Sequence, residues 1–247
     1  MQIKNVLISQ SAPSGTSPYS EIISKYGVKI DFRPFFSVEG VSQRDFVSQH
    51  VAILDYSAIV FTSRIAIDSF FKICEQTRVI VPDTMKYFCQ SEAIALYLQK
   101  YIVYRKRKIF FGSGTVASMV EAIGAKHKAD NFLITCTDNL KEDVDSIFTK
   151  ARLKHGSVVL ARTIHNDVSG LNLSDYQVLA FYSPSDVKSL FENFKEFKQG
   201  ESVIATYGPS TAKAAREAGL NVGIEAPSPG APSIAQALLK YLEENGR

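Results

Sequence analysis

Cysteine and histidine are scarce in this chain. Its 247 residues include three cysteines, Cys74, Cys89 and Cys136. An odd number without paired spacing argues against a disulfide framework, and the spacing does not match a zinc site either. The four histidines form no HxxxH-type pair, so we expect no metal. We interpret the cysteines as small core residues in a reducing compartment.

Strong charge and long apolar runs are also missing. The formal net charge is +3 at pH 7, which does not indicate the concentrated basic face of a nucleic-acid-binding protein. The one basic run, Arg105 to Lys108, lies between apolar segments and is interpreted as a solvated turn or strand end. No stretch approaches the roughly 20 apolar residues of a membrane helix. The first apolar run is too short for a signal peptide, so we expect a cytoplasmic protein that binds neither nucleic acid nor membrane.

Motifs for nucleotide binding and for nucleophilic catalysis are weak or absent. Residues 112–115 form a glycine-containing turn that lacks the lysine of a P-loop and the third glycine of a dinucleotide fingerprint. No GxSxG elbow is present. Residues 9–17 follow the first predicted strand and contain Pro, Ser, Gly and Thr, which leaves a flavodoxin-like nucleotide-binding protein as one alternative. Tyr19, Tyr56 and Tyr176 are interpreted as packing or surface residues rather than acids.

Short β-rich runs alternate with helical patterns along the chain. Strands are predicted at residues 6–8, 58–61, 87–89, 109–111, 132–134, 178–182, 203–205 and 222–224. Helices are predicted at residues 19–26, 46–53, 64–74, 115–123, 141–152, 209–218 and 232–244, with two more that end near residues 98 and 194. Such alternation implies α/β architecture, with parallel sheets covered on both faces.

The strands are too many for one small flavodoxin-like sheet, so we predict two domains. Two extended segments, near 28–38 and 157–166, are the natural linkers between them, and Pro34 favours an edge strand or linker for part of the first. A single break near residue 125 is the alternative. The predicted domains are 1–36 with 167–247 (domain 1, discontinuous) and 37–166 (domain 2).

Three strand-to-helix junctions share one design, a hydrophobic strand followed by a helix with a small hydroxyl residue or glycine at its cap. They are Phe61-Thr62-Ser63-Arg64, Phe181-Tyr182-Ser183-Pro184-Ser185 and Tyr207-Gly208-Pro209-Ser210-Thr211. In the second, Ser183 is the predicted N-cap and Asp186 completes a capping box. In the third, Gly208 is the predicted N-cap and Pro209 the first helical residue.

The third junction leaves the N–H groups of Ser210 and Thr211 without intrahelical partners. Such groups, with the helix dipole, make anion sites, and in parallel sheets they lie at the carboxyl edge where ligands bind. Helix capping alone explains any one junction. Three matching junctions, however, could face each other across a cleft and hold a ligand with several carboxylates.

These junctions also carry a resemblance to a known family. The segments VFTSRIAIDSFF (60–71), LAFYSPSDVKSLFENF (179–194) and IATYGPSTAKAAREAGLNVGIEAPSPGAPSIAQALLKYL (204–242) resemble the uroporphyrinogen-III synthases. That family has a strand ending in FTS before a helix in each half and a late G-P-x-T-A helix start. The resemblance implies two flavodoxin-like domains joined by a two-stranded linker, a monomer, and no metal or organic cofactor.

The resemblance also implies a substrate and a reaction. The substrate is hydroxymethylbilane, a linear tetrapyrrole that loses hydroxide from its terminal hydroxymethyl group. The resulting azafulvene is attacked by the substituted carbon of ring D, and the spiro intermediate fragments and recloses with ring D inverted. Unassisted closure gives the non-inverted isomer, so the enzyme holds a flexible polyanion in one geometry and stabilises charged intermediates.

The family's site residues carry over by position. Thr211 matches the threonine of G-P-x-T-A and is the main catalytic candidate, while Ser63 and Ser183 match carboxylate-binding positions. Arg64 and Lys213 are candidate charge partners, with solvated helix faces as their alternative role. The full set expected to bind substrate is Thr62, Ser63, Arg64, Ser183, Pro184, Ser185, Gly208, Pro209, Ser210 and Lys213.

Three positions differ from the family pattern. Residues 160–163 read Leu-Ala-Arg-Thr where the family often has a tyrosine proposed as general acid, and Tyr182 and Tyr207 are the candidates to replace it. Gln10 stands where an arginine often follows the first strand. Residues 89–93 lack the glycine and threonine of the middle G-x-x-T-A motif. The missing tyrosine favours, as the alternative, a non-catalytic two-domain module that binds a tetrapyrrole or another polycarboxylate, whereas the GPSTA start and the paired FTS-like junctions favour the enzyme.

Overall fold

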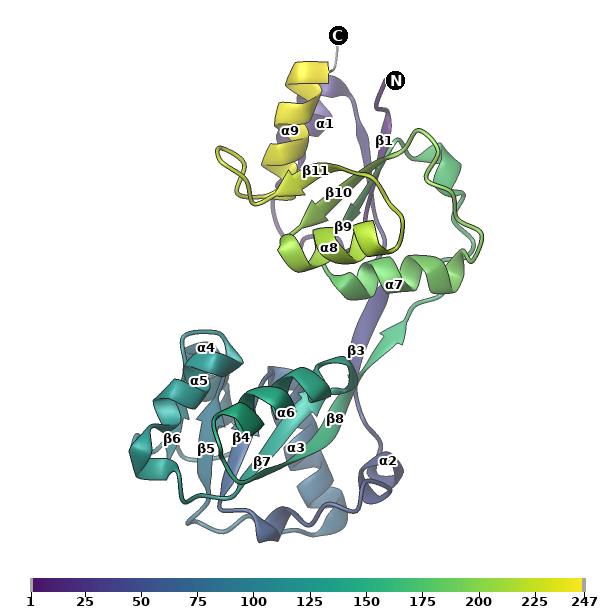
Figure 1. The fold of residues 1–247 in the computed structure, drawn as a ribbon. Coiled ribbons are helices and arrows are strands. Elements are labelled where there is room, and N and C mark those ends of the chain that lie inside the picture. The colour runs from purple at the N-terminus through teal and green to yellow at the C-terminus, as the bar shows by residue number, and fades with distance from the viewer. Residues whose placement is uncertain (1, 246–247) are drawn as a thin grey trace. The chain divides into compact units, whose positions relative to one another are not determined.

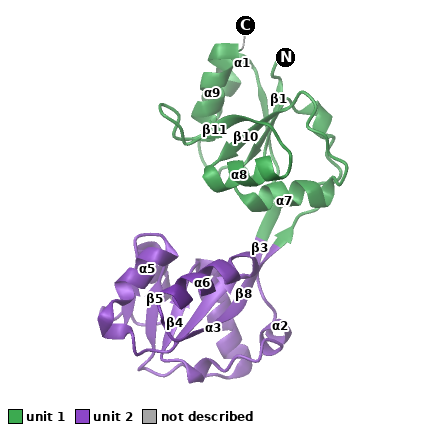
Figure 2. Cartoon of the chain, in the orientation of Figure 1, with its two compact units in different colours: residues 1–37, 164–247 green, residues 38–163 purple. Residues whose placement is uncertain are grey.

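The computed structural model describes residues 2–245 of the chain, which divide into two compact units (Figures 1 and 2). Unit 2 is Val38–Thr163, and unit 1 consists of the described residues on both sides of it. The chain passes between the units within two strands, β3 (Phe36–Gly40) and β8 (His155–His165). Residues 1, 246 and 247, which the sequence analysis assigned to domain 1, lie outside the described residues.

Unit 1 contains a parallel sheet with the strand order β11-β10-β9-β1-β2. The strands are β1 (Asn5–Ile8), β2 (Lys29–Phe32), β9 (Val178–Phe181), β10 (Val203–Tyr207) and β11 (Val222–Ala226). Numbered within the unit, this is the flavodoxin order 2-1-3-4-5. The direction of winding reverses between β1 and β9, so a crevice forms at their carboxyl ends.

Helices cover both faces of the unit 1 sheet (Figure 1). One face carries α1 (Ser20–Tyr26) and α9 (Ile234–Asn245), and the other carries α7 (Pro184–Asn193) and α8 (Pro209–Glu217). Along β1, Val6 and Ile8 pack under α1 and α9, whereas Leu7 packs under α7 and α8. Because side chains alternate along a strand, both faces must be apolar, which explains the uninterrupted hydrophobic runs.

Unit 2 contains a sheet with the order β3-β8-β7-β4-β5-β6. Its further strands are β4 (Ala58–Phe61), β5 (Lys86–Cys89), β6 (Ile109–Phe111) and β7 (Phe132–Thr137). One face carries α2 (Gln43–Val47), α3 (Arg64–Thr77) and α4 (Glu92–Tyr97), and the other carries α5 (Val116–Ile123) and α6 (Lys141–Lys150). Single 3₁₀ turns occur at Ile53–Asp55, Leu98–Lys100, Ala125–His127, Asp138–Leu140 and Leu173–Asp175.

The two sheets share one spatial arrangement of strands, but the strands follow one another along the sequence in a different order in each sheet. The order β8-β7-β4-β5-β6 in unit 2 corresponds to β2-β1-β9-β10-β11 in unit 1. The central strands β4 and β9 follow similar sequences, Asp55-Tyr56 and Asp175-Tyr176, and end in Phe61-Thr62-Ser63 and Phe181-Tyr182-Ser183. The two FTS-like junctions therefore occupy equivalent places, each beside the crevice of its own sheet.

The predicted fold class, α/β with parallel sheets, is confirmed. The extended segment at 28–38 divides into β2 and β3, each an edge strand of its sheet, and Pro34 lies in the link between them. The predicted helix at 46–53 is wrong. Helix α2 begins earlier, because Ser42 accepts a hydrogen bond from the backbone N of Asp45 (3.2 Å), and His50 adopts a positive φ of 53° that prevents continuation.

Candidate active site

An open cavity of about 470 Å³ lies at the β1–β9 crevice of unit 1. It is lined by Ser9, Gln10, Ser11, Pro34, Phe36, Tyr182, Ser183 and Asp186. Ligands of open α/β sheets bind at such a reversal point, outside the carboxyl ends of the strands. The crevice is therefore the first place in unit 1 to look for chemistry.

The start of α7 is capped by its own side chains. Ser183 is the N-cap and Pro184 the first helical residue, as predicted. The Asp186 carboxylate accepts hydrogen bonds from the backbone N–H groups of Tyr182 and Ser183, both at 2.9 Å, and the Asp186 N–H donates to Ser183 Oγ (3.3 Å). Among the N–H groups at this helix start, that of Ser185 makes no hydrogen bond with the described residues.

Asp186 is a functional candidate that the sequence analysis interpreted only as a cap. Burial raises its carboxyl pKa, against the lowering influence of the Tyr182 N–H and of the Ser9 and Ser183 hydroxyls. Asp186 Oδ1 and Ser9 Oγ are enclosed and make no hydrogen bond of normal geometry with the described residues. A buried carboxyl with a raised pKa at the edge of a cavity is suited to holding or moving a proton.

Three tyrosines lie together on the other side of the crevice. The hydroxyls of Tyr19 and Tyr182 are 2.7 Å apart, and the Tyr182 ring stacks on Tyr207 with 5.7 Å between centroids. Burial is the largest cause of a raised pKa for both Tyr19 and Tyr182, so both keep their protons at neutral pH. Tyr19 packs in the core of unit 1, as predicted, and its hydroxyl in addition contacts that of Tyr182.

The start of α8 has no side chain that caps it. Gly208, with a φ of 82°, is the N-cap and Pro209 the first helical residue, as predicted, and glycine has no side chain to accept a hydrogen bond. The N–H groups of Ser210 and Thr211 make no hydrogen bond with the described residues. Thr211 is 1% exposed and its hydroxyl also lacks a partner among them. Two N–H groups and a hydroxyl at a helix start are groups that can donate hydrogen bonds to an anion.

At the equivalent junction of unit 2, several side chains already bind other groups of the protein. Thr62 Oγ1 donates to the backbone oxygen of Thr135 (3.0 Å), which ties β4 to β7. Ser63 caps α3 by accepting from the Ala66 N–H (3.1 Å). The Arg64 guanidinium lies over the Tyr97 ring at 5.4 Å. The backbone N–H groups of Arg64 and residue 65 remain for a ligand.

Two other regions that the sequence analysis singled out have few free cations or hydrogen-bond donors for a polyanion. Lys213 forms an exposed ion pair with Glu217 (3.7 Å), which fits its solvated-face alternative. The start of α4, where the middle motif has lost its threonine, carries Glu92, which lines a second open cavity together with Glu121. Two carboxylates there disfavour a ligand that is itself rich in carboxylates.

Other ligand classes find little support. Within residues 2–245, no three His, Cys, Asp or Glu side chains converge as metal ligands would. Helix α1 begins at Ser20, and the N–H groups of Tyr19 and Ser20 donate to Ser17 Oγ (3.2 Å) and to the Ser17 backbone oxygen (3.1 Å), so they are not left for a phosphate. In the same described range, every helix is too short or too polar to cross a bilayer.

Comparison with known proteins identifies the family. The model of the uroporphyrinogen-III synthase HemD family matches residues 17–236. A mutant uroporphyrinogen III synthase of Thermus thermophilus is 14% identical, with a TM-score of 0.62, and the alignment covers 98% of this chain and 100% of that one. The uroporphyrinogen-III synthetase of Helicobacter pylori is 18% identical, with a TM-score of 0.58, and the alignment covers 98% of this chain and 100% of that one. The comparison with curated proteins finds no match. Since the family model covers most of the chain and the fold agrees, the chain belongs to the uroporphyrinogen-III synthase HemD family.

Proposed function

We propose that this chain is a cyclising lyase that converts hydroxymethylbilane into uroporphyrinogen III with inversion of ring D and release of water. The family match over residues 17–236 supports the reaction. The observation that supports the site is the uncapped start of α8, where Ser210 N–H, Thr211 N–H and the Thr211 hydroxyl are all unpartnered within the described residues.

The start of α8 holds a carboxylate of the substrate. A propionate or acetate oxygen accepts hydrogen bonds from the Ser210 and Thr211 N–H groups, and the helix dipole adds a favourable charge interaction. The Thr211 hydroxyl supplies a third donor. In unit 2 the free N–H groups at the start of α3, together with Arg64, are our candidates for a second carboxylate. Fixing several carboxylates selects one folded geometry of a flexible chain.

Tyr182 assists the loss of hydroxide. Its pKa is raised by burial, so the phenol remains protonated and donates a hydrogen bond to the departing oxygen. Tyr19 supports it by fixing the orientation of the hydroxyl at 2.7 Å, and stacking against Tyr207 fixes the ring. Tyr182, supported by Tyr19, takes over the role of the tyrosine that the family often has at the position of Ala161. Ala161 itself is fully buried in β8.

Asp186 stabilises the positive charge that forms next. When the C–O bond breaks, hydroxide leaves and takes up a proton as water, and the remaining azafulvene is an electron-poor cation. A new C–C bond then forms from the substituted carbon of ring D, the spiro intermediate fragments and recloses, and ring D loses a proton to restore aromaticity. The Asp186 carboxyl lines the cavity and provides a negative charge for the cation. Because its Oδ1 is enclosed, the proton lost from ring D goes to solvent, which balances the proton that the departing hydroxide takes up.

The test is to separate the product isomers. Hydroxymethylbilane, made freshly by its own synthase, is mixed with this protein, the products are oxidised, and porphyrin isomers I and III are resolved by chromatography. We expect isomer III to dominate, whereas a parallel sample without the protein gives isomer I. If the folded protein leaves isomer I dominant, the non-catalytic binding module becomes the better description.

A monomeric state and a cytoplasmic location remain part of the proposal. The three free, buried cysteines are compatible with a reducing compartment. Light scattering coupled to size-exclusion chromatography tests the monomer directly, since a mass of twice 27.3 kDa would contradict it.

A further inference from the structure

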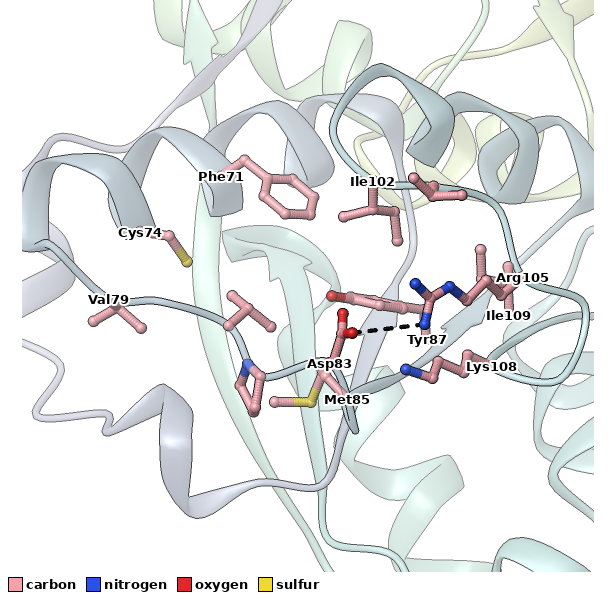
Figure 3. A pocket seen from close by; sticks show the side chains of 13 residues that line it. Phe71, Cys74, Val79, Asp83, Met85, Tyr87, Ile102, Arg105, Lys108 and Ile109 are labelled. Carbon is pink, nitrogen blue, oxygen red and sulfur yellow. Dashed lines mark ion pairs between the residues drawn. The ribbon is translucent and has the colours of Figure 1, made fainter.

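A third cavity, of about 350 Å³, lies in unit 2 at the amino ends of β5 and β6 (Figure 3). It is therefore at the opposite end of β5 from Ser91 and the carboxyl edge. Its wall is mainly apolar and includes Phe71, Val79, Val81, Met85, Ile102 and Ile109. The volume falls in the range of small-molecule sites, about 300–1,000 Å³. None of these residues has a part in the proposed reaction.

The basic run that the sequence analysis assigned to a solvated turn borders this cavity. The Lys108 N–H donates to the Arg105 backbone oxygen (2.8 Å) and closes a turn. As a result, Arg105 and Lys108 come back to the cavity and are half-buried, while Lys106 and Arg107 stay exposed. The turn was predicted correctly, but two of its four cations are not simply solvated.

One of these two cations lacks a counter-ion among the described residues. Arg105 forms an ion pair with Asp83 at 3.6 Å, drawn as the dashed line in Figure 3. The Asp83 side chain is 91% exposed, so the pair is weak. Lys108 makes no ion pair or hydrogen bond through its side chain with the part of the chain that the structure describes. Counting Arg105, Lys108 and Asp83, the cavity mouth has one uncompensated positive charge.

The floor of the cavity contributes a buried donor. Tyr87 is 5% exposed, and its ring stacks on Phe61 at 6.2 Å between centroids. Its hydroxyl makes no hydrogen bond with the described residues and lies among the cavity side chains in Figure 3. Burial raises its pKa to about 12, so it is a donor at neutral pH. The hydroxyl oxygen is not among the enclosed atoms without a partner, so it is accessible and can donate to a ligand in the cavity that Tyr87 lines.

We propose that this cavity binds a small apolar molecule that ends in a single carboxylate. Its apolar body lies between Phe71 and Ile102, and its carboxylate accepts hydrogen bonds from Lys108 Nζ and the Tyr87 hydroxyl. A monoanion matches the one uncompensated charge, whereas a dianion such as phosphate would be repelled by Asp83. The same argument excludes the tetrapyrrole, whose several carboxylates have too few cations here.

Naphthoate is a suitable probe, because it is an aromatic monocarboxylate and its fluorescence can be followed in a chain without tryptophan. We expect saturable binding at one site. Lys108→Gln and Tyr87→Phe should each weaken it by roughly tenfold or more, the usual effect of losing a hydrogen bond to a charged group. Lys106→Gln removes the same charge from the exposed part of the turn and should leave affinity unchanged.

Three outcomes would overturn the proposal. They are the absence of saturable binding, equal affinity for the uncharged naphthamide, and an affinity that Lys108→Gln leaves unaltered. Thermal unfolding of each variant verifies its fold. Because Lys108 is at the cavity mouth and not in the core, Lys108→Gln decides the question even if Tyr87→Phe is unstable.

Discussion

Thr211 allows a binding role to be separated from a folding role. Its side chain is 1% exposed, and its hydroxyl makes no hydrogen bond with the described residues. Thr211→Val keeps the shape and removes that hydroxyl. The hydroxyl oxygen is not among the enclosed atoms without a partner, so water can hydrogen-bond to it in the free protein. The variant should therefore be about as stable as the parent, with a melting temperature within about 2 °C of it.

Activity, in contrast, should fall. A hydrogen bond to a charged group contributes about 1.5–3 kcal/mol, so losing the bond to a substrate carboxylate should lower kcat/KM by roughly 10- to 150-fold. Thr206→Val is the matched control. Thr206, on β10, also has a hydroxyl without a partner among the described residues, but that atom is completely enclosed, so its removal should stabilise the fold and leave turnover unchanged.

The assay is the rate of isomer III formation at several hydroxymethylbilane concentrations, with thermal unfolding measured on the same samples. Full activity of Thr211→Val would refute the role of its hydroxyl. Equal losses in the Thr211→Val and Thr206→Val variants would also refute it, because the effect would then belong to the packing of α8 and β10 and not to substrate binding.

Three further predictions concern other residues. Tyr182→Phe should lower kcat about tenfold or more with little change in KM, because its hydrogen bond strengthens as hydroxide departs; an unchanged kcat in the same assay contradicts this. Asp186 has a raised pKa in the folded state, so its contribution to stability is fully present below the unfolded pKa of about 3.9 and is lost as pH rises through the folded value. Asp186→Asn should remove that pH dependence from urea unfolding, and a curve with the parent's slope would argue against it. Ser63→Ala should lower the free energy of unfolding by about 0.5–2 kcal/mol through loss of the α3 cap, and an unaltered urea midpoint would disprove it.

The features that could be predicted from the sequence are those that depend on residues close together in the chain. Strands buried on both faces read as short hydrophobic runs, and the caps at Ser183 and Gly208 depend on residues within three positions of each. The helix predicted at 46–53 shows where this reasoning fails. The prediction followed the apolar spacing, whereas the helix in the structure begins after the N-cap Ser42. The structure brings the predicted junction residues to the carboxyl edges of both sheets, and their roles in catalysis remain predictions.

Contacts between distant segments could not be predicted in this way. Tyr19 and Tyr182 are 163 positions apart, and Ser9 meets Asp186 only because β1 lies beside β9. No local pattern encodes that adjacency; it follows from strand order, which the sequence left open. The cavity behind the basic turn has the same origin, since its wall combines α3, β5, β6 and the loops between them.

The central claim is that the first turn of α8 holds a carboxylate of the tetrapyrrole. It is tested most directly by amide hydrogen exchange with and without uroporphyrinogen III, kept free of oxygen. The account predicts slower exchange at Ser210 and Thr211, whose N–H groups have no partner within the described residues, and no change at Tyr182 and Ser183, whose N–H groups already donate to Asp186. Unchanged exchange at Ser210 and Thr211 in a saturated complex would contradict it.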